Sequence, residues 1–212
     1  LFGAVHDGEA DIIVGTQMIT KGHDYKRVSL VGVIDADASL FSQDYRASER
    51  LFAQLMQVAG RAGRSEKTGR SRVVIQTRYP NAAPYTYLKT NDVDGFLGEI
   101  KSERELVGLP PFSYQALVHA EHKTLLAAID MLKEAVKSSR ADESWPSIVS
   151  LSDVIPRAMV RVAGKERAQV LIESSNRQAL QRAIQVMQHY LTEQNTKRKG
   201  VGWYIERDPI MI

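Results

Sequence analysis

The chain has 212 residues, of which 43% are hydrophobic, and a formal net charge of +3 at pH 7. This length and hydrophobic content predict two domains of about 100 residues each, and the mildly basic balance permits a nucleic-acid partner without requiring one. The absence of cysteine excludes disulfide frameworks and thiolate metal sites and favours a reducing, cytoplasmic environment. No apolar run approaches the roughly 18 residues of a membrane span, so no membrane association is expected.

The first half of the chain alternates short apolar runs with helical patterns. Its β-branched runs are typical of strands covered on both faces, and they lie at residues 10–17, 28–37 and 70–77. Helices are predicted over residues 48–62 and 93–106, and the second ends at GLPPF because proline cannot continue a helix. This order predicts a doubly wound α/β sheet. We place the domains at residues 1–108 and 109–212. The start without methionine, just before a strand pattern, predicts a fragment cut inside a domain.

The second half has the element order β-α-β-β-α-β. The predicted strands are residues 113–122, 156–164, 167–175 and 201–208, and the predicted helices are residues 124–139 and 176–194. The sequence GKE between the middle strands predicts a hairpin turn, and Asn176 is available as the N-cap of the second helix. This order is that of the ferredoxin-like α+β fold.

The stretch QVAGRAGR, Gln57 to Arg64, combines two arginines with two glycines. The planar guanidinium matches phosphate oxygens, and a glycine before each arginine lets the backbone approach a bulky anion. An arginine placed in this way can stabilise a transferring phosphoryl group. Taken alone, the run is equally consistent with a solvated basic helix end. No GxxxxGK[ST] loop occurs in the sequence, so the phosphate would have to be held by another lobe.

A second polar stretch, VGTQMITKGHDY, follows the first predicted strand. Loops at the carboxyl ends of parallel strands are where open α/β sheets bind ligands. Thr16, Gln17, Lys21 and Gly22 offer hydrogen bonds, charge and close approach to a sugar-phosphate backbone. The pair His23 and Asp24 could be catalytic, but no serine or cysteine partner is marked out, so capping and loop hydrogen bonds are favoured.

Three further features favour structural roles over chemical ones. Asp35 and Asp37 could bind Mg²⁺, yet aspartates at strand ends commonly form turns. The basic run 197–199 is most economically a loop, with phosphate contact as the alternative. Trp203 and Tyr204 alternate along a strand, so at most one faces solvent, and neither is assigned to base stacking.

Together, GTQMITKGHD, SQDYRASERLFAQLMQVAGRAGR and GLPPF resemble the second motor lobe of superfamily 2 helicases. More narrowly, they are similar to the primosomal protein N-prime family of replication restart helicases, and the resemblance covers nearly the whole chain. It implies a partial RecA-like doubly wound parallel sheet followed by a ferredoxin-like C-terminal domain. It also implies an ATP-dependent 3′-to-5′ DNA helicase, a hydrolase of ATP, that restarts stalled replication forks and assembles the primosome.

The resemblance gives roles to both polar stretches. GTQMITKGHD is similar to helicase motif V, in which Thr16, Gln17 and Lys21 would line the single-stranded DNA. Gly22 and Asp24 of the same motif would couple that contact to the nucleotide cleft.

QVAGRAGR is similar to helicase motif VI. In this motif Gln57, Arg61 and Arg64 would face the ATP γ-phosphate, with Gly60 and Gly63 in the nucleotide-binding set. Many superfamily members have a further arginine directly after the glutamine, whereas this chain has valine there. ATP and Mg²⁺ would be bound mainly by the first lobe, which is missing from this sequence. Zinc is expected only in the family's cysteine-rich module upstream.

The resemblance also implies partners for the C-terminal domain. These are single-stranded and forked DNA, other primosome proteins, and the acidic C-terminal tail of single-stranded DNA-binding protein. Arg177 and Gln181 match the family's tail-binding pair, at a helix N-terminus suited to a carboxylate. A solvated helix face is the alternative. The closing IERDP departs from the family's Asp-Val-Asp-Pro, so no role is given to Glu206 or Asp208.

Three hypotheses follow. In the first, the chain is the back part of a helicase and is inactive alone because it lacks the phosphate-binding loop. In the second, the chain acts only as a binding module for DNA and the acidic tail. A metabolic nucleotide-binding enzyme would need a glycine-rich phosphate loop or a catalytic triad, and neither is found.

Overall fold

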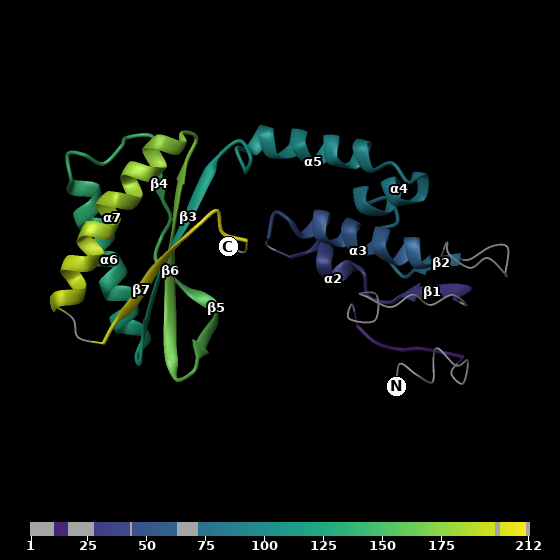
Figure 1. Cartoon of the computed structure of the whole chain (residues 1–212), viewed down its shortest axis with the longest axis horizontal. Helices are drawn as coiled ribbons and strands as arrows, with labels where there is room; N and C mark the ends of the chain where they lie inside the picture. The colour runs from purple at the N-terminus through teal and green to yellow at the C-terminus, as the bar shows by residue number, and fades with distance from the viewer. Residues whose placement is uncertain (1–10, 17–27, 43, 63–71, 198–199, 211–212) are drawn as a thin grey trace. The chain divides into compact units, whose positions relative to one another are not determined.

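The computed structural model describes residues 11–16, 28–42, 44–62, 72–197 and 200–210. Contacts divide the chain into two compact units, Leu1–Ile100 and Lys101–Ile212. The helix labelled α5 in Figure 1, Val93–Val107, crosses this division. The domain boundary at residues 108/109 stays a prediction. In the parts of the chain described, no helix combines the length and the apolar character needed to cross a membrane.

The first unit contains a parallel pair of strands and several helices. Besides α5, its elements are β1 (Leu30–Val33), α2 (Asp37–Leu40), α3 (Ala47–Ala62), β2 (Arg72–Ile75) and α4 (Ala83–Thr90). Leu30 is paired with Arg72 and Val33 with Ile75, in parallel. The pairing agrees with the parallel sheet expected of this half.

The helix α3 forms because its apolar side chains recur at helical spacing. Leu51 and Leu55 are buried and pack in a cluster with Tyr85. Phe52 stacks on Phe96 of α5, with the ring centroids 4.1 Å apart. Buried side chains one turn apart fix which side of α3 faces inward.

Two expectations for this half are wrong. Residues 11–16 form no strand, although 10–17 was predicted as one. Ile12 and Val14 are 82% and 90% exposed, so within the described ranges no neighbouring strand buries the side chains of this run or pairs with its backbone. In addition, β1 and β2 are not covered on both faces, because Leu30 and Val74 are more than half exposed.

The second unit is an antiparallel sheet with two helices. Its elements are β3 (Tyr114–His122), α6 (Leu125–Ala141), β4 (Val149–Leu151), β5 (Ile155–Val162), β6 (Lys165–Ser174), α7 (Arg177–Lys197) and β7 (Gly202–Arg207). The strand order is β4-β6-β3-β7, and β5 also pairs with β6. Figure 1 shows α6 and α7 side by side against the sheet.

The core of the second unit lies between the sheet and these helices. Alternate residues of the strands, such as Val118 and Val170, point into it because strand side chains alternate between faces. Leu132 of α6 and Met187 of α7 meet them and are fully buried. One face of the sheet is therefore covered by α6 and α7. The other face carries the side chains of the intervening strand residues, which point away from these helices.

The mixed α/β class is confirmed, and most predicted elements are observed within a few residues of their expected bounds. Strand β4 and helices α2 and α4 were not predicted. The predicted hairpin is confirmed, but its two-residue turn is Ala163 at φ 49° and Gly164 at φ 77°, whereas Lys165 and Glu166 of GKE already belong to β6. Positive φ at both central positions is what the twist of a tight hairpin requires.

Candidate functional site

The QVAGRAGR stretch begins on α3, opposite the packed side of that helix. Positions 57, 60 and 61 are three and four residues apart, so they share one side of the helix. Gln57 is half-buried and Gly60 is exposed. A Cβ built on Gly60 meets nothing within 4 Å, so packing in the described part of the chain does not require glycine there.

Much of the predicted motor site lies outside what the structure describes. Thr16 is exposed and belongs to no helix or strand. The backbone of Arg61 is helical, but its side chain is not described. The remaining predicted residues lie outside the described ranges: Gln17, Lys21, Gly22, Asp24, Gly63 and Arg64. Their roles stay predictions.

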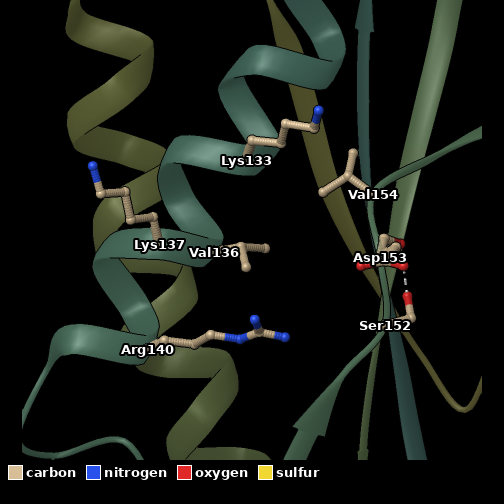
Figure 2. Close-up of a pocket in the computed structure, with 7 residues that line it drawn as sticks. All are labelled: Lys133, Val136, Lys137, Arg140, Ser152, Asp153 and Val154. Carbon is tan, nitrogen blue, oxygen red and sulfur yellow. Dashed lines mark hydrogen bonds between the residues drawn. The ribbon is translucent and has the colours of Figure 1, made fainter.

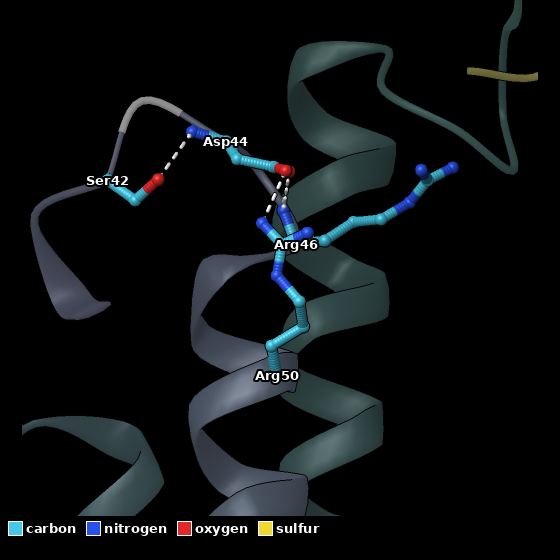
Figure 3. Close-up of polar contacts among 4 residues, drawn as sticks. All are labelled: Ser42, Asp44, Arg46 and Arg50. Carbon is cyan, nitrogen blue, oxygen red and sulfur yellow. Dashed lines mark hydrogen bonds and ion pairs between the residues drawn. The ribbon is translucent and has the colours of Figure 1, made fainter. Parts of the chain in front are cut away.

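The segment before α3, within SQDYRASER, is organised around Asp44 (Figure 3). The backbone N–H of Arg46 donates to Asp44 Oδ1 at 2.8 Å, and Arg50 forms an ion pair with Asp44 Oδ2. The Asp44 N–H in turn donates to Ser42 Oγ at 3.3 Å. The Asp44 side chain is only 8% exposed. These contacts fix the first turn of α3 and hence the direction of the helix that carries QVAGRAGR.

Asp37 links three segments of the first unit. Its carboxylate accepts hydrogen bonds from Thr77 Oγ1 at 2.5 Å, from the Arg78 N–H at 2.7 Å and from the Tyr85 hydroxyl at 2.9 Å. The Arg78 backbone and Thr77 hydroxyl contacts hold the pKa of Asp37 below its usual range. Burial, together with the bond to Asp37, raises the pKa of Tyr85 to about 12. Asp37 therefore joins the start of α2 to the segment after β2 and to α4.

Asp35 differs from Asp37 in its conformation. It is exposed and adopts φ 56°, the left-handed conformation that aspartate tolerates better than most residues. Among the described residues, no group of three or more His, Asp or Glu side chains is arranged to hold a metal ion.

The second unit presents the start of α7. Asn176 caps this helix as predicted, because its Oδ1 accepts the N–H groups of Gln178 at 2.9 Å and Ala179 at 3.0 Å. Arg177 is exposed at the first helical position, and Gln181 is half-buried one turn later. The two side chains therefore lie near one helix end, but the backbone donors at residues 178 and 179 are already used.

The sheet face opposite the helices carries a polar network. His119 of β3 is paired across the strands with Tyr204 of β7, and their rings stack with centroids 4.4 Å apart. His119 Nε2 lies 3.1 Å from the Glu206 carboxylate. Arg157 of β5 donates to the Tyr204 hydroxyl at 3.1 Å, so its side chain reaches across the sheet. The network ties β5 to the opposite edge strand.

Sequence reasoning missed this network, although it predicted the alternation that produces it. Trp203 packs against the core, while Tyr204 is 47% exposed on the other face. Burial lowers the pKa of His119, and Arg157 adds to the effect. No local pattern signals that Arg157, which is far from Tyr204 in the sequence, contacts it.

Comparison of the sequence with known proteins identifies a family. Residues 105–210 match the family model described as the primosomal protein N C-terminal domain. Two similar proteins are the replication restart proteins PriA of Haemophilus influenzae, 35% identical over 91% of this chain, and of Bacillus subtilis, 33% identical over 100% of it. A third, from Synechocystis, is 37% identical over 78% of this chain.

The chain spans 26% of the length of the first two relatives and 20% of the third. Among solved structures, the de novo designed protein Foldit4 overlaps 46% of this chain and 97% of its own, with 11% identity and a TM-score of 0.34. That likeness is too low for any conclusion. Since the family model matches half of its 212 residues, the chain belongs to the primosomal protein N (PriA) family.

Proposed function

We propose that this chain is the C-terminal part of an ATP-dependent DNA helicase that restarts stalled replication forks and assembles the primosome in the cytoplasm. The observation that carries the proposal is the similarity to replication restart proteins over nearly the whole chain, including the segment with QVAGRAGR. In this proposal the first unit is part of a RecA-like second motor lobe. The second unit is a ferredoxin-like module, and its strand order β4-β6-β3-β7 supports that assignment.

The motor chemistry would lie on the outer side of α3. Arg61 and Arg64 would stabilise charge on the transferring γ-phosphoryl group, and Gln57 would hydrogen-bond near it. The described residues fit this role, because Gly60 is exposed and leaves room for a phosphate. ATP with Mg²⁺ would supply the phosphoryl group, held mainly by residues of another lobe. Thr16, Gln17 and Lys21 would contact DNA, and Gly22 and Asp24 would link the two sites.

ATP hydrolysis tests this function. We expect the 212-residue chain alone to show no DNA-stimulated ATP turnover, because its sequence has no phosphate-binding loop. In a full-length relative, replacing the arginine that corresponds to Arg61 or Arg64 by alanine should lower kcat by about 10³-fold or more. Replacing the residue that corresponds to the exposed Arg72 is the matched control and should have little effect. Turnover by this chain alone, or no loss in the arginine variants, would contradict the proposal.

A second candidate function is supported by the start of α7. The exposed Arg177 at a capped helix N-terminus favours a module that binds the acidic tail of single-stranded DNA-binding protein. Titration of a labelled acidic tail peptide should show weaker binding for Arg177→Ala than for the native chain. Arg182→Ala, exposed on the same helix, should bind like the native chain. Equal affinities for all three proteins would remove Arg177 from the site.

A further inference from the structure

A groove with a cationic wall lies between α6 and the segment that joins β4 to β5 (Figure 2). Its volume is about 470 Å³. The helix contributes Lys133, Val136, Lys137 and Arg140, and the facing segment contributes Ser152, Asp153 and Val154. The groove is formed by the second unit alone.

Arg140 is held across this groove. Its Nη2 donates to the Leu151 carbonyl at 3.1 Å, and Figure 2 shows its guanidinium extended from α6 toward Ser152. A guanidinium has five N–H donors. Among the described residues, no carboxylate forms an ion pair with Arg140. The remaining donors are thus oriented over the groove and available to an anion.

The two lysines extend this positive surface along the helix. Lys133 and Lys137 lie one turn apart, roughly 6 Å along the axis, and Arg140 follows after another turn. In Figure 2 Lys133 is directed toward the strands, while Lys137 is directed away from them at the outer edge. Neither lysine has an ion-pair partner among the described residues. The lining therefore contains three cations and one carboxylate, Asp153. Lys133 and Arg140 extend toward the facing segment, and Lys137 lies at the outer edge.

The lining favours a phosphate backbone over a peptide. Valines 136 and 154 are its apolar residues, and no aromatic side chain or deep apolar pocket is present among the residues that form it. Peptide partners are generally anchored by an apolar or aromatic side chain in such a pocket. A row of unpaired cations, with an arginine fork held in place, instead suits successive phosphodiesters and needs no anchor.

We propose that this groove binds the phosphate backbone of single-stranded nucleic acid independently of its sequence. The inference rests on the proposed DNA function and assigns part of it to a specific surface. It also separates DNA contact, on α6, from the proposed acidic-peptide contact at the start of α7. Phosphate contacts position the strand without reading its bases, so no base preference is expected.

Fluorescence anisotropy of a labelled oligothymidylate with the full 212-residue chain tests the groove over a salt series. The triple variant Lys133→Gln, Lys137→Gln, Arg140→Gln should bind roughly tenfold or more weakly at low salt. The slope of log K against log salt should fall in magnitude by about 2, because each single-strand phosphate contact contributes about 0.7. A control that removes three exposed cations elsewhere in the second unit, Lys101, Lys123 and Arg182, should keep most of the affinity and slope.

The outcomes separate the possible failures. If the native chain binds and the triple variant matches it, the groove proposal is overturned while the DNA function stands. If the native chain shows no binding at low salt, the DNA-binding part of the proposed function fails as well. If the variant loses an acidic peptide but keeps DNA, the occupant is a peptide and the proposal is wrong. The pair Lys133→Gln, Lys137→Gln, which spares the Arg140 contact, should reduce the slope by about 1.4 if the triple variant does not fold.

Discussion

His119 illustrates how a side chain's surroundings determine its chemistry. It is 2% exposed, and its Nε2 faces the Glu206 carboxylate, which can only accept a hydrogen bond. The neutral ring therefore carries its proton on Nε2, and Nδ1 is left buried without a hydrogen-bond partner in the described structure. Protonation would place an unsatisfied N–H and a positive charge near Arg157 and Arg167. Burial, reinforced by these arginines, thus lowers the pKa of His119 from its ordinary 6.5.

This shift predicts a dependence of stability on pH. Since the pKa of His119 is lower in the folded chain than in the unfolded chain, the unfolded state binds the proton more readily. The free energy of unfolding of the second unit should be highest above about pH 6.5 and fall as the pH drops below it. Denaturant unfolding from neutral to mildly acidic pH measures the effect.

The comparison variant is His119→Gln, which cannot titrate in this range. Its unfolding free energy should depend less on pH than that of the native chain, even if its overall stability is lower. His189→Gln, which removes an exposed histidine, should keep the native pH dependence. An identical pH profile for His119→Gln and the native chain would show that His119 is not the responsible group.

Among the elements, α3 has one side that packs against the first unit and stabilises the helix. On its outer side, packing does not require the glycine at position 60. Leu51 and Leu55 hold the helix against the first unit, whereas Gly60 lies within the helix and contacts nothing at its Cβ position. Glycine inside a helix is less favourable than alanine by roughly 0.5–1 kcal/mol. Its presence is explained if a phosphate approaches the backbone there, as the proposed function requires.

Substitution of this glycine separates stability from function. Gly60→Ala should stabilise the first unit by roughly 0.5–1 kcal/mol, as measured by thermal or denaturant unfolding. The corresponding change in a full-length relative should lower ATP turnover if a phosphate approaches this side of the helix.

Gly95 of α5 gives the opposite case. A Cβ there would lie 2.7 Å from both Asp92 Cγ and Tyr87 Cε1, and the Gly95 N–H donates to the Asp92 carboxylate at 2.8 Å. Gly95→Ala should therefore destabilise the same unit. If Gly60→Ala also destabilised it, some contact of Gly60 with residues outside the described ranges would be implied, and the argument for an open helix face would fail.

At the scale of the whole molecule, each unit has buried clusters of its own, two in the described part of the first unit and one in that of the second. The second unit buries Leu132 completely between α6, α7 and the sheet. Leu132→Ala should lower the free energy of unfolding of this unit by about 2–5 kcal/mol, since both burial and packing are lost. Leu126→Ala, on the same helix but 68% exposed, should cost much less. Equal effects of the two substitutions, measured by denaturant unfolding, would contradict the assigned core.

The sequence by itself determined where most helices and strands lie. Apolar spacing located α3, α6 and α7, Gly164 marked the hairpin, and Asn176 marked the start of α7, because each signal depends on residues close together in the chain. The motif QVAGRAGR is likewise recognised from adjacent residues, and it is one of the segments by which the sequence resembles the family. The prediction of a strand at residues 10–17 is wrong for the described residues 11–16. A strand forms only where a second strand pairs with it, and the residues of the run itself do not show whether such a strand is present.

Only the tertiary structure decided which distant residues meet. Asp37 and Thr77 are 40 positions apart, and Arg157 and Tyr204 are 47 apart, yet both pairs are hydrogen-bonded. The groove of Lys133 and Arg140 likewise depends on the chain returning at Ser152 to face α6. Side-chain type and spacing limit what each segment can do. The pairing of strands and the packing of helices on one sheet face determine which segments face one another. They therefore also determine where cationic side chains come together to bind an anion.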